Sequence, residues 1–366
     1  MNLLTSWFKR TFADPQVVIL GIVLIVGVAV VAGLGQMLAP VFAGIVLAYL
    51  LEAAVVRLQK LGLPRLASVS LVFLLFLASL FFLLFGLVPM LIRQVTQLVQ
   101  QIPNYITQGQ DLLLELPKRY PQMISEEQIQ SLIGGVGTEL GMAGQQFLTW
   151  SLTSVGTVVG LLVLLVLIPV LVFFLLKDKD LLISWFKAYL PDERHLLTSV
   201  WVDVEAQIAN YVRGKAGEIV IVGAVSYITF VSLGLQYSAL LATMVGFSVL
   251  IPYIGAAVIT LPIAFVAYFQ WGWSWSFGQV MIAYAIIQAL DGNVLVPLLF
   301  SEALNLHPVA IIVAILVFGG LWGFWGVFFA IPLATVVQAV LKTWPRAIAD
   351  DETDQEAPSE EDQNVA

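Results

Sequence analysis

The chain of 366 residues is 60% hydrophobic and only 11% charged, and its mean hydropathy is +0.96. This balance excludes an ordinary soluble domain and is typical of a protein that crosses a membrane several times. The net charge of -8 arises from eight acidic residues at positions 350–362; outside them, acidic and basic residues are equal in number. No basic nucleic-acid surface is therefore expected, and the lack of cysteine excludes disulfides, thiol catalysis and Cys-ligated metals.

Apolar runs long enough to cross a bilayer recur along the chain, and a membrane-spanning helix needs about 20 such residues. We predict an all-α integral membrane protein with eight spans, at residues 17–37, 40–56, 66–92, 152–176, 218–235, 239–269, 277–300 and 308–341. The first is expected to be a retained helix rather than a cleaved signal peptide. Gly33, Gly35 and Pro40 join it closely to the second, which predicts a helical hairpin. The sixth and eighth exceed one bilayer thickness, so each should tilt or break.

Lys and Arg in short loops indicate the cytoplasmic side of a membrane protein. With eight spans, thirteen of the sixteen basic residues fall on one side, and both termini are predicted to be cytoplasmic. The predicted regions are an N-terminal membrane region 1–92, an extracytoplasmic amphipathic segment 93–150, a fourth span 151–176, a cytoplasmic amphipathic segment 177–215, a membrane transport region 216–345 and a disordered acidic tail 346–366.

Both predicted extramembrane segments contain an apolar stripe at helical spacing. The first stripe comprises Val95, Leu98, Val99, Ile102 and Ile106, and the second comprises Leu197, Val200, Trp201, Val204, Ile208 and Tyr211. We predict Asp192 as the N-cap of the second helix. Packing on the protein's own body is favoured for both stripes over lipid sensing, although either use needs the same stripe.

Residues 216–341 contain no Lys or Arg, and their only acidic residues are Glu218, Asp291 and Glu302. Helix breakers are frequent there. Pro252, Gly255 and Pro262 are expected to interrupt the sixth span, Asp291-Gly292-Asn293 and Pro297 the seventh, and Pro332 the eighth. Broken helices at membrane depth are tolerated where they face protein or a wet cavity, and they indicate a transport site.

Asp291 is the candidate that carries the most weight. A carboxylate inside a span costs several kcal/mol and is normally kept for an interior pathway or a pairing partner. We predict that Asp291 binds a coupling proton or cation or gates the substrate, with Asn293 and the carbonyls near Pro252 as further ligands and with Gly292 and Gly255 giving the backbone room. The alternative is that Asp291 only caps a half-helix.

The other polar residues have weaker interpretations. An interfacial ion pair with Lys215 or Arg213 is favoured for Glu218, and Glu52 is expected to extend toward Arg57 or water. His307 reads as a helix-start residue, with proton acceptor as the alternative. Gly319 and Gly323 show GxxxG spacing, with Gly320 and Gly326 nearby, which indicates close helix packing or a hinge.

Signatures of enzymes and of bound metals do not occur in the sequence. There is no HExxH, no P-loop and no second embedded aspartate beside Asp291. No catalytic residue, cofactor or metal site is therefore predicted, and any pumping is expected to be secondary.

The segments YVRGKAG (211–217), IPYIGAAVITLPIAF (251–265) and LDGNVLVPLLF (290–300), with the run that follows to Pro345, carry a family resemblance. The chain resembles the AI-2E (autoinducer-2 exporter) transporter family, and within it the PerM-like permease branch, over nearly its whole length. Many members have Gln where this chain has Lys215. The motif positions matched are Pro252, Gly255, Pro262, Asp291, Gly292, Asn293, Pro297, His307, Pro308, Gly323, Gly326 and Pro332.

The resemblance implies a bacterial inner-membrane transporter with eight spans that forms a homo-oligomer, a pentamer as the family is understood. Family members are described as exporters of autoinducer-2 or as sodium/proton antiporters. The predicted function is secondary export of a small polar metabolite or signal, coupled to H⁺ or Na⁺. Cation/proton antiport is the second candidate, and a membrane scaffold without transport is an alternative of another class.

Overall fold

The computed structural model describes residues 15–119, 155–189, 195–252, 254–300 and 307–343. The chain forms two compact units. Unit 1 comprises Met1–Phe42, Asp178–Ala216 and Leu298–Ala366, and unit 2 comprises Ala43–Lys177 and Gly217–Pro297. The predicted acidic tail, the N-cap Asp192, Glu302 and the second half of the 93–150 segment lie outside the described residues.

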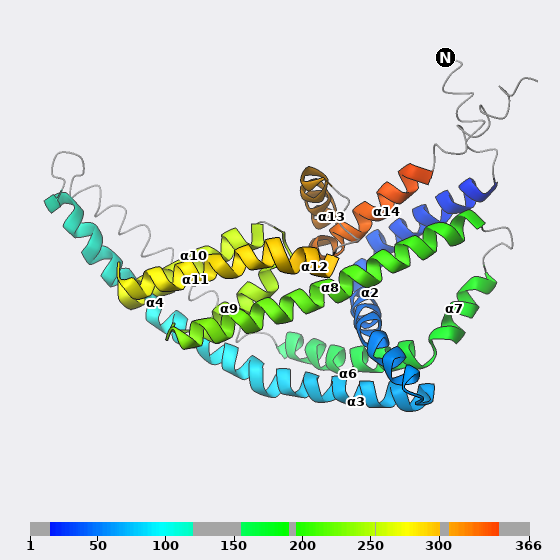
Figure 1. Cartoon of the computed structure of the whole chain (residues 1–366), viewed down its shortest axis with the longest axis horizontal. Helices are drawn as coiled ribbons and strands as arrows, with labels where there is room; N and C mark the ends of the chain where they lie inside the picture. The colour runs from blue at the N-terminus through cyan, green and yellow to red at the C-terminus, as the bar shows by residue number, and fades with distance from the viewer. Residues whose placement is uncertain (1–14, 120–154, 190–194, 253, 301–306, 344–366) are drawn as a thin grey trace, which may run out of the picture. The chain divides into compact units, whose positions relative to one another are not determined.

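All regular structure in the described residues is helical, which confirms the predicted all-α class (Figure 1). The elements are α2 (Pro15–Lys60), α3 (Arg65–Phe82), the π-helical turn η1 (Leu83–Leu87), α4 (Val88–Arg119), α6 (Val155–Lys177), α7 (Lys179–Ala188), α8 (His195–Ser232), α9 (Ser238–Ser248), α10 (Ile254–Trp271), α11 (Trp275–Leu290), the π-helical turn η2 (Asp291–Leu295), α12 (Val296–Phe300), α13 (Pro308–Phe328) and α14 (Ala330–Thr343).

Six helical stretches of the described residues are long and apolar enough to cross a membrane. They are Met37–Lys60, Arg65–Asp111, Val204–Ser232, Ile254–Trp271, Trp275–Phe300 and Pro308–Phe328; Val163–Lys177 and Ser238–Ser248 are shorter apolar helices. The chain is therefore a multi-pass membrane protein, while the count of eight spans is not confirmed.

Helix α2 shows where one expectation was wrong. Gly33, Gly35 and Pro40 all lie inside a single helix of 46 residues, so the first two predicted spans do not form a hairpin. A glycine costs a helix only about 1 kcal/mol, and proline is tolerated inside membrane helices because neighbouring groups satisfy the freed carbonyl. The long helix α8 likewise runs without interruption from the predicted cytoplasmic segment into the fifth predicted span.

The sixth predicted span breaks, as expected. Helix α9 has 11 residues, about 16 Å of helix, which cannot cross a hydrocarbon core of about 30 Å. It packs against α10 within unit 2. The turn between them is so tight that a Cβ on Gly255 would lie 1.8 Å from the carbonyl oxygen of Ser248. Pro262 lies inside α10 without ending it.

The eighth predicted span also breaks, but at Gly323 rather than at Pro332. Gly323 has φ 58° and ψ -132°, a backbone conformation that suits glycine. Beyond it the chain returns on itself, since a Cβ on Gly326 would lie 1.8 Å from the Phe318 carbonyl oxygen. Pro332 lies in the first turn of α14, where a missing N–H costs little. Gly326 is therefore closely packed, but against the preceding part of α13, and the predicted approach of another helix stays a prediction.

One apolar core of unit 2 is built mainly from α8, α9, α10 and α11, and Figure 1 shows α10 and α11 side by side. A second core of this unit joins α2, α3 and α6. The described part of the 93–150 segment packs on the first core. Leu98 contacts it, Tyr105 meets the Phe265 ring edge-on at 5.5 Å, and the Gln94 side-chain oxygen accepts the Leu240 N–H at 2.8 Å. Packing on the protein's own body, the favoured interpretation of this stripe, is confirmed for Leu98.

Candidate functional site

The predicted helix break at Asp291-Gly292-Asn293 is instead a π-helical turn. Asp291 has φ -58° and ψ -58°, and its N–H reaches the carbonyls of Ile287 and Gln288, so the backbone stays helical from Trp275 to Phe300. A single π turn inside an α-helix widens the backbone by one residue and is found frequently at functional sites. Pro297 lies inside the helical turn that follows.

Three polar side chains lie along one face of this helix. Tyr284, Gln288 and Asp291 are spaced by four and three residues, which places them on one stripe. Tyr284 is buried, whereas Gln288 and Asp291 are half-buried. The side-chain nitrogen of Gln288 and the Oδ1 atom of Asp291 are both shielded from solvent. The stripe therefore presents polar atoms to the inside of a membrane-spanning unit.

Tyr284 connects this stripe to the start of α10. Its hydroxyl donates to the carbonyl oxygen of Ala256 at 2.8 Å, one residue after Gly255. Asp291 lies seven residues further along the same helix, about 10 Å by helix rise. Sequence reasoning missed Tyr284 and Gln288, although their spacing from Asp291 is the signal that could have found them.

The other residues of the predicted site are placed differently. The Asn293 side-chain nitrogen donates to the Ala289 carbonyl at 2.8 Å, and the side chain is exposed. Residues two apart on a helix do not face each other, so Asn293 does not lie beside Asp291. Pro252 lies in the turn before α10, where its carbonyl accepts the Ile254 N–H at 2.7 Å. A Cβ added at Gly292 would meet no atom within 4 Å, so there is open space beside the backbone at this position.

His307 belongs to unit 1 and caps helix α13. Its Nδ1 atom accepts the Val309 N–H at 3.2 Å, and Pro308 occupies the first helical position. This arrangement confirms the helix-start interpretation, because it satisfies one of the amides that a helix leaves unpaired at its N-terminus. A role for His307 as a proton acceptor stays a prediction, as do the hinge roles of Gly320 and Gly323.

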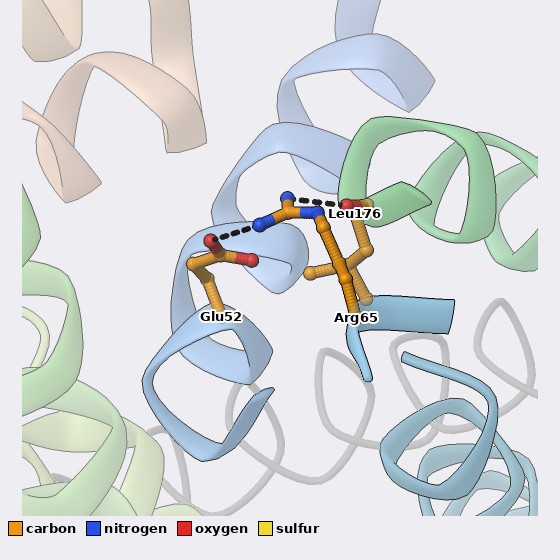
Figure 2. A network of polar contacts seen from close by, with 3 residues as sticks. All are labelled: Glu52, Arg65 and Leu176. Carbon is orange, nitrogen blue, oxygen red and sulfur yellow. Dashed lines mark hydrogen bonds and ion pairs between the residues drawn. The ribbon is translucent and has the colours of Figure 1, made fainter. Parts of the chain in front are cut away.

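A second polar cluster in unit 2 was not foreseen (Figure 2). The Arg65 guanidinium donates to the Leu176 carbonyl oxygen at 2.9 Å and lies 3.6 Å from a Glu52 carboxylate oxygen. Arg65, at the start of α3, thus connects this helix to the end of α6 and to Glu52 of α2. The expectation that Glu52 extends toward Arg57 or water was wrong, because Glu52 is only 9% exposed and faces Arg65.

Among the described residues, no group of three His, Asp or Glu side chains could hold a metal ion. The candidate site consists of one carboxylate, one amide and one phenol on a helix that is long and apolar enough to cross a membrane. Such groups can bind a proton, a monovalent cation or a small polar solute.

Comparison with known proteins agrees with this architecture. A family model described as AI-2E family transporter matches residues 17–346. The chain is 43% identical over 345 residues to the Escherichia coli K12 protein named "Putative permease PerM", covering 94% of this chain and 98% of that protein. It is 29% identical over 296 residues to the Bacillus subtilis protein named "Putative transport protein YueF", covering 80% of each. The chain therefore belongs to the AI-2E family of bacterial membrane transporters.

Proposed function

We propose that this protein is a secondary transporter that exports a small polar metabolite or signal such as autoinducer-2, driven by a proton or cation gradient that acts through Asp291. One observation carries the proposal. Asp291 places a carboxylate with a solvent-shielded oxygen on a π-helical turn, inside a helix long enough to cross the membrane. The relatives named as a permease and a transport protein support transport in general.

The electrostatics of the region favour binding of a positive charge. A carboxylate at membrane depth is costly unless a proton, a cation or a fixed group neutralises it. Exchange of a proton or a sodium ion at the Asp291 carboxylate would let this site alternate between two states, which a coupled transporter needs.

Tyr284 and Gln288 extend the polar stripe beyond the carboxylate. They give the site hydrogen-bond donors and acceptors at one- and two-turn spacing, which suits a small polar solute better than a bare ion. The second candidate function, sodium or cation/proton antiport, uses the same Asp291 carboxylate without a solute, and the embedded acid itself is the observation that favours it.

The proposal also includes the membrane in which the protein lies, the location of its termini and its oligomeric state. We place the protein in the bacterial inner membrane, as the family resemblance implies, and the cytoplasmic location of both termini stays a prediction of the eight-span arrangement. A homo-oligomer, with a pentamer as the first candidate, follows from the family resemblance.

The test is flux in sealed proteoliposomes that contain the purified protein. Sodium and proton gradients are imposed separately, internal pH is read by a dye, and autoinducer-2 is offered as the trial solute. Solute movement that a gradient accelerates supports export, and sodium-driven pH change without solute supports antiport. If no condition differs from empty vesicles, coupled transport is contradicted for these ions and this solute. A scaffold is then the better explanation; it would recruit partners through the 346–366 tail and the 93–150 segment and would not depend on Asp291.

A further inference from the structure

Helix α7 (Lys179–Ala188) exposes nearly all of its apolar side chains. Leu181 is 69% exposed, Trp185 54%, Phe186 63% and Tyr189, which follows the helix, 73%. No residue of α7 is buried. Large apolar side chains gathered on one short helix are a recognised sign of an interaction surface, whereas scattered ones are not.

The apolar residues of α7 lie together on one side. Leu181, Trp185 and Tyr189 recur at four-residue spacing, and Phe186 lies next to them. The Trp185 ring lies 5.0 Å from both the Phe186 and the Tyr189 rings, centroid to centroid. The opposite side carries Asp180, Ser184 and Lys187, which are all exposed. Helix α7 is therefore amphipathic, and its apolar side is rich in aromatic rings.

The position of α7 in the chain indicates what covers this side. The apolar helix α6 ends at Lys177, and only Asp178 separates it from Lys179, the first residue of α7. One linking residue spans less than about 4 Å, so α7 begins where α6, which contains most of the fourth predicted span, ends. A helix of 10 residues, about 15 Å long, cannot cross the membrane again.

The composition of α7 matches that boundary. Tryptophan and tyrosine are enriched where hydrocarbon meets headgroups, and amphipathic helices in this zone carry Lys on their polar side and Trp, Phe and Leu on the other. Lys177, Lys179 and Lys187 stand at the two ends of α7, where their long side chains can extend to headgroups. A lipid surface accounts for both the apolar side and the flanking lysines.

We propose that α7 is an interfacial helix, and that its side formed by Leu181, Trp185, Phe186 and Tyr189 inserts into the leaflet at which α6 ends. The lipid boundary between headgroups and acyl chains is the partner. This inference rests on the membrane assignment of α6 and is independent of the proposed transport function.

The absence of cysteine from the chain makes a direct test possible. Single cysteines are introduced at Leu181, Trp185 and Tyr189 on the apolar side, and at Asp180, Ser184 and Lys187 on the polar side as matched controls. Each is labelled with a nitroxide in proteoliposomes of phosphatidylethanolamine and phosphatidylglycerol. Collision of the label with oxygen, which concentrates in lipid, is compared with collision with a water-soluble nickel chelate. All six positions are exposed, so the variants are expected to fold, and size-exclusion profiles check this.

The proposal predicts that labels at 181, 185 and 189 collide several-fold more with oxygen than with the nickel chelate, and that labels at 180, 184 and 187 show the reverse. Equal nickel access on both sides would place α7 in water and overturn the proposal. Labels at 181 and 185 that are immobilised and shielded from both reagents would also overturn it, since a second copy or another protein segment would then cover this side.

Discussion

Replacing Arg65 by methionine is predicted to destabilise unit 2 more than any change at the neighbouring surface arginine, Arg57. The guanidinium bonds a carbonyl in the last turn of α6, where helix carbonyls lack partners of their own. Losing a hydrogen bond from a charged donor costs about 1.5–3 kcal/mol. Methionine keeps the length of the aliphatic stem, so the change isolates the polar contacts of Arg65 from its packing.

The second contact of Arg65 adds to this cost. The Glu52 carboxylate lies 3.6 Å from the guanidinium, and its side chain is only 12% exposed. At an effective dielectric constant of about 20 the direct attraction is about 4–5 kcal/mol, and desolvation of both groups offsets most of it. We therefore expect Arg65→Met to lower the free energy of unfolding by about 3 kcal/mol, and Glu52→Gln to lower it by about 1–2 kcal/mol.

A double-mutant cycle measures the coupling itself. Unfolding is followed by intrinsic fluorescence during titration with SDS in mixed micelles, for the two single variants, the double variant and the control Arg57→Met. A coupling energy of about 1 kcal/mol or more between positions 52 and 65 is expected, because the two groups touch. A coupling near zero, or a loss for Arg57→Met as large as for Arg65→Met, would refute the assignment of this cluster as a tie between α2, α3 and α6.

Three further stability predictions can be checked with the same titration. Gly255→Ala should lower the free energy of unfolding by about 3 kcal/mol or more, because the added Cβ would lie 1.8 Å from a backbone carbonyl oxygen. The control Gly278→Ala, which has open space around the added Cβ, should be neutral or stabilising. Equal effects of the two changes would argue against the tight turn before α10. Gly326→Ala should be similarly damaging and Gly320→Ala harmless, so a harmless Gly326→Ala would contradict the return of the chain at Gly323. Tyr284→Phe removes the hydroxyl bond to α10 and should cost about 1 kcal/mol; no loss would mean that this bond does not hold α11 to α10.

The class of fold follows from the long apolar runs in the sequence. Only helices and closed barrels can satisfy backbone groups in lipid, and runs of about 20 apolar residues are the length that a spanning helix needs. The long apolar runs are helical, and Leu98 of the α4 stripe packs on the core as its spacing predicts. The breaks were harder to locate. Pro252 and Gly323 mark real interruptions, whereas Pro40, Pro262 and Pro297 lie inside helices. Proline restricts the backbone without deciding whether the helix ends, since packing neighbours can compensate for the lost hydrogen bond.

Only part of the candidate site could be predicted from the sequence. Asp291 is conspicuous in sequence because a charged group in an apolar run is rare. Tyr284 and Gln288 are ordinary residues in a membrane helix, and only the helical stripe gives them meaning. Arg65 was missed because a basic residue at a span end is usually an orientation signal. Its contacts with Glu52 and Leu176 join residues 13 and 111 positions apart, which no local pattern reports.

The role of Asp291 can be measured most directly by comparing Asp291→Asn with Asp111→Asn in the same proteoliposomes. Both changes remove one negative charge, but Asp111 is exposed at the far end of α4. We expect gradient-driven flux to fall to the level of empty vesicles in Asp291→Asn and to stay at the wild-type level in Asp111→Asn, with folding and oligomer size unchanged in both. Wild-type flux in Asp291→Asn would contradict the coupling role of this carboxylate.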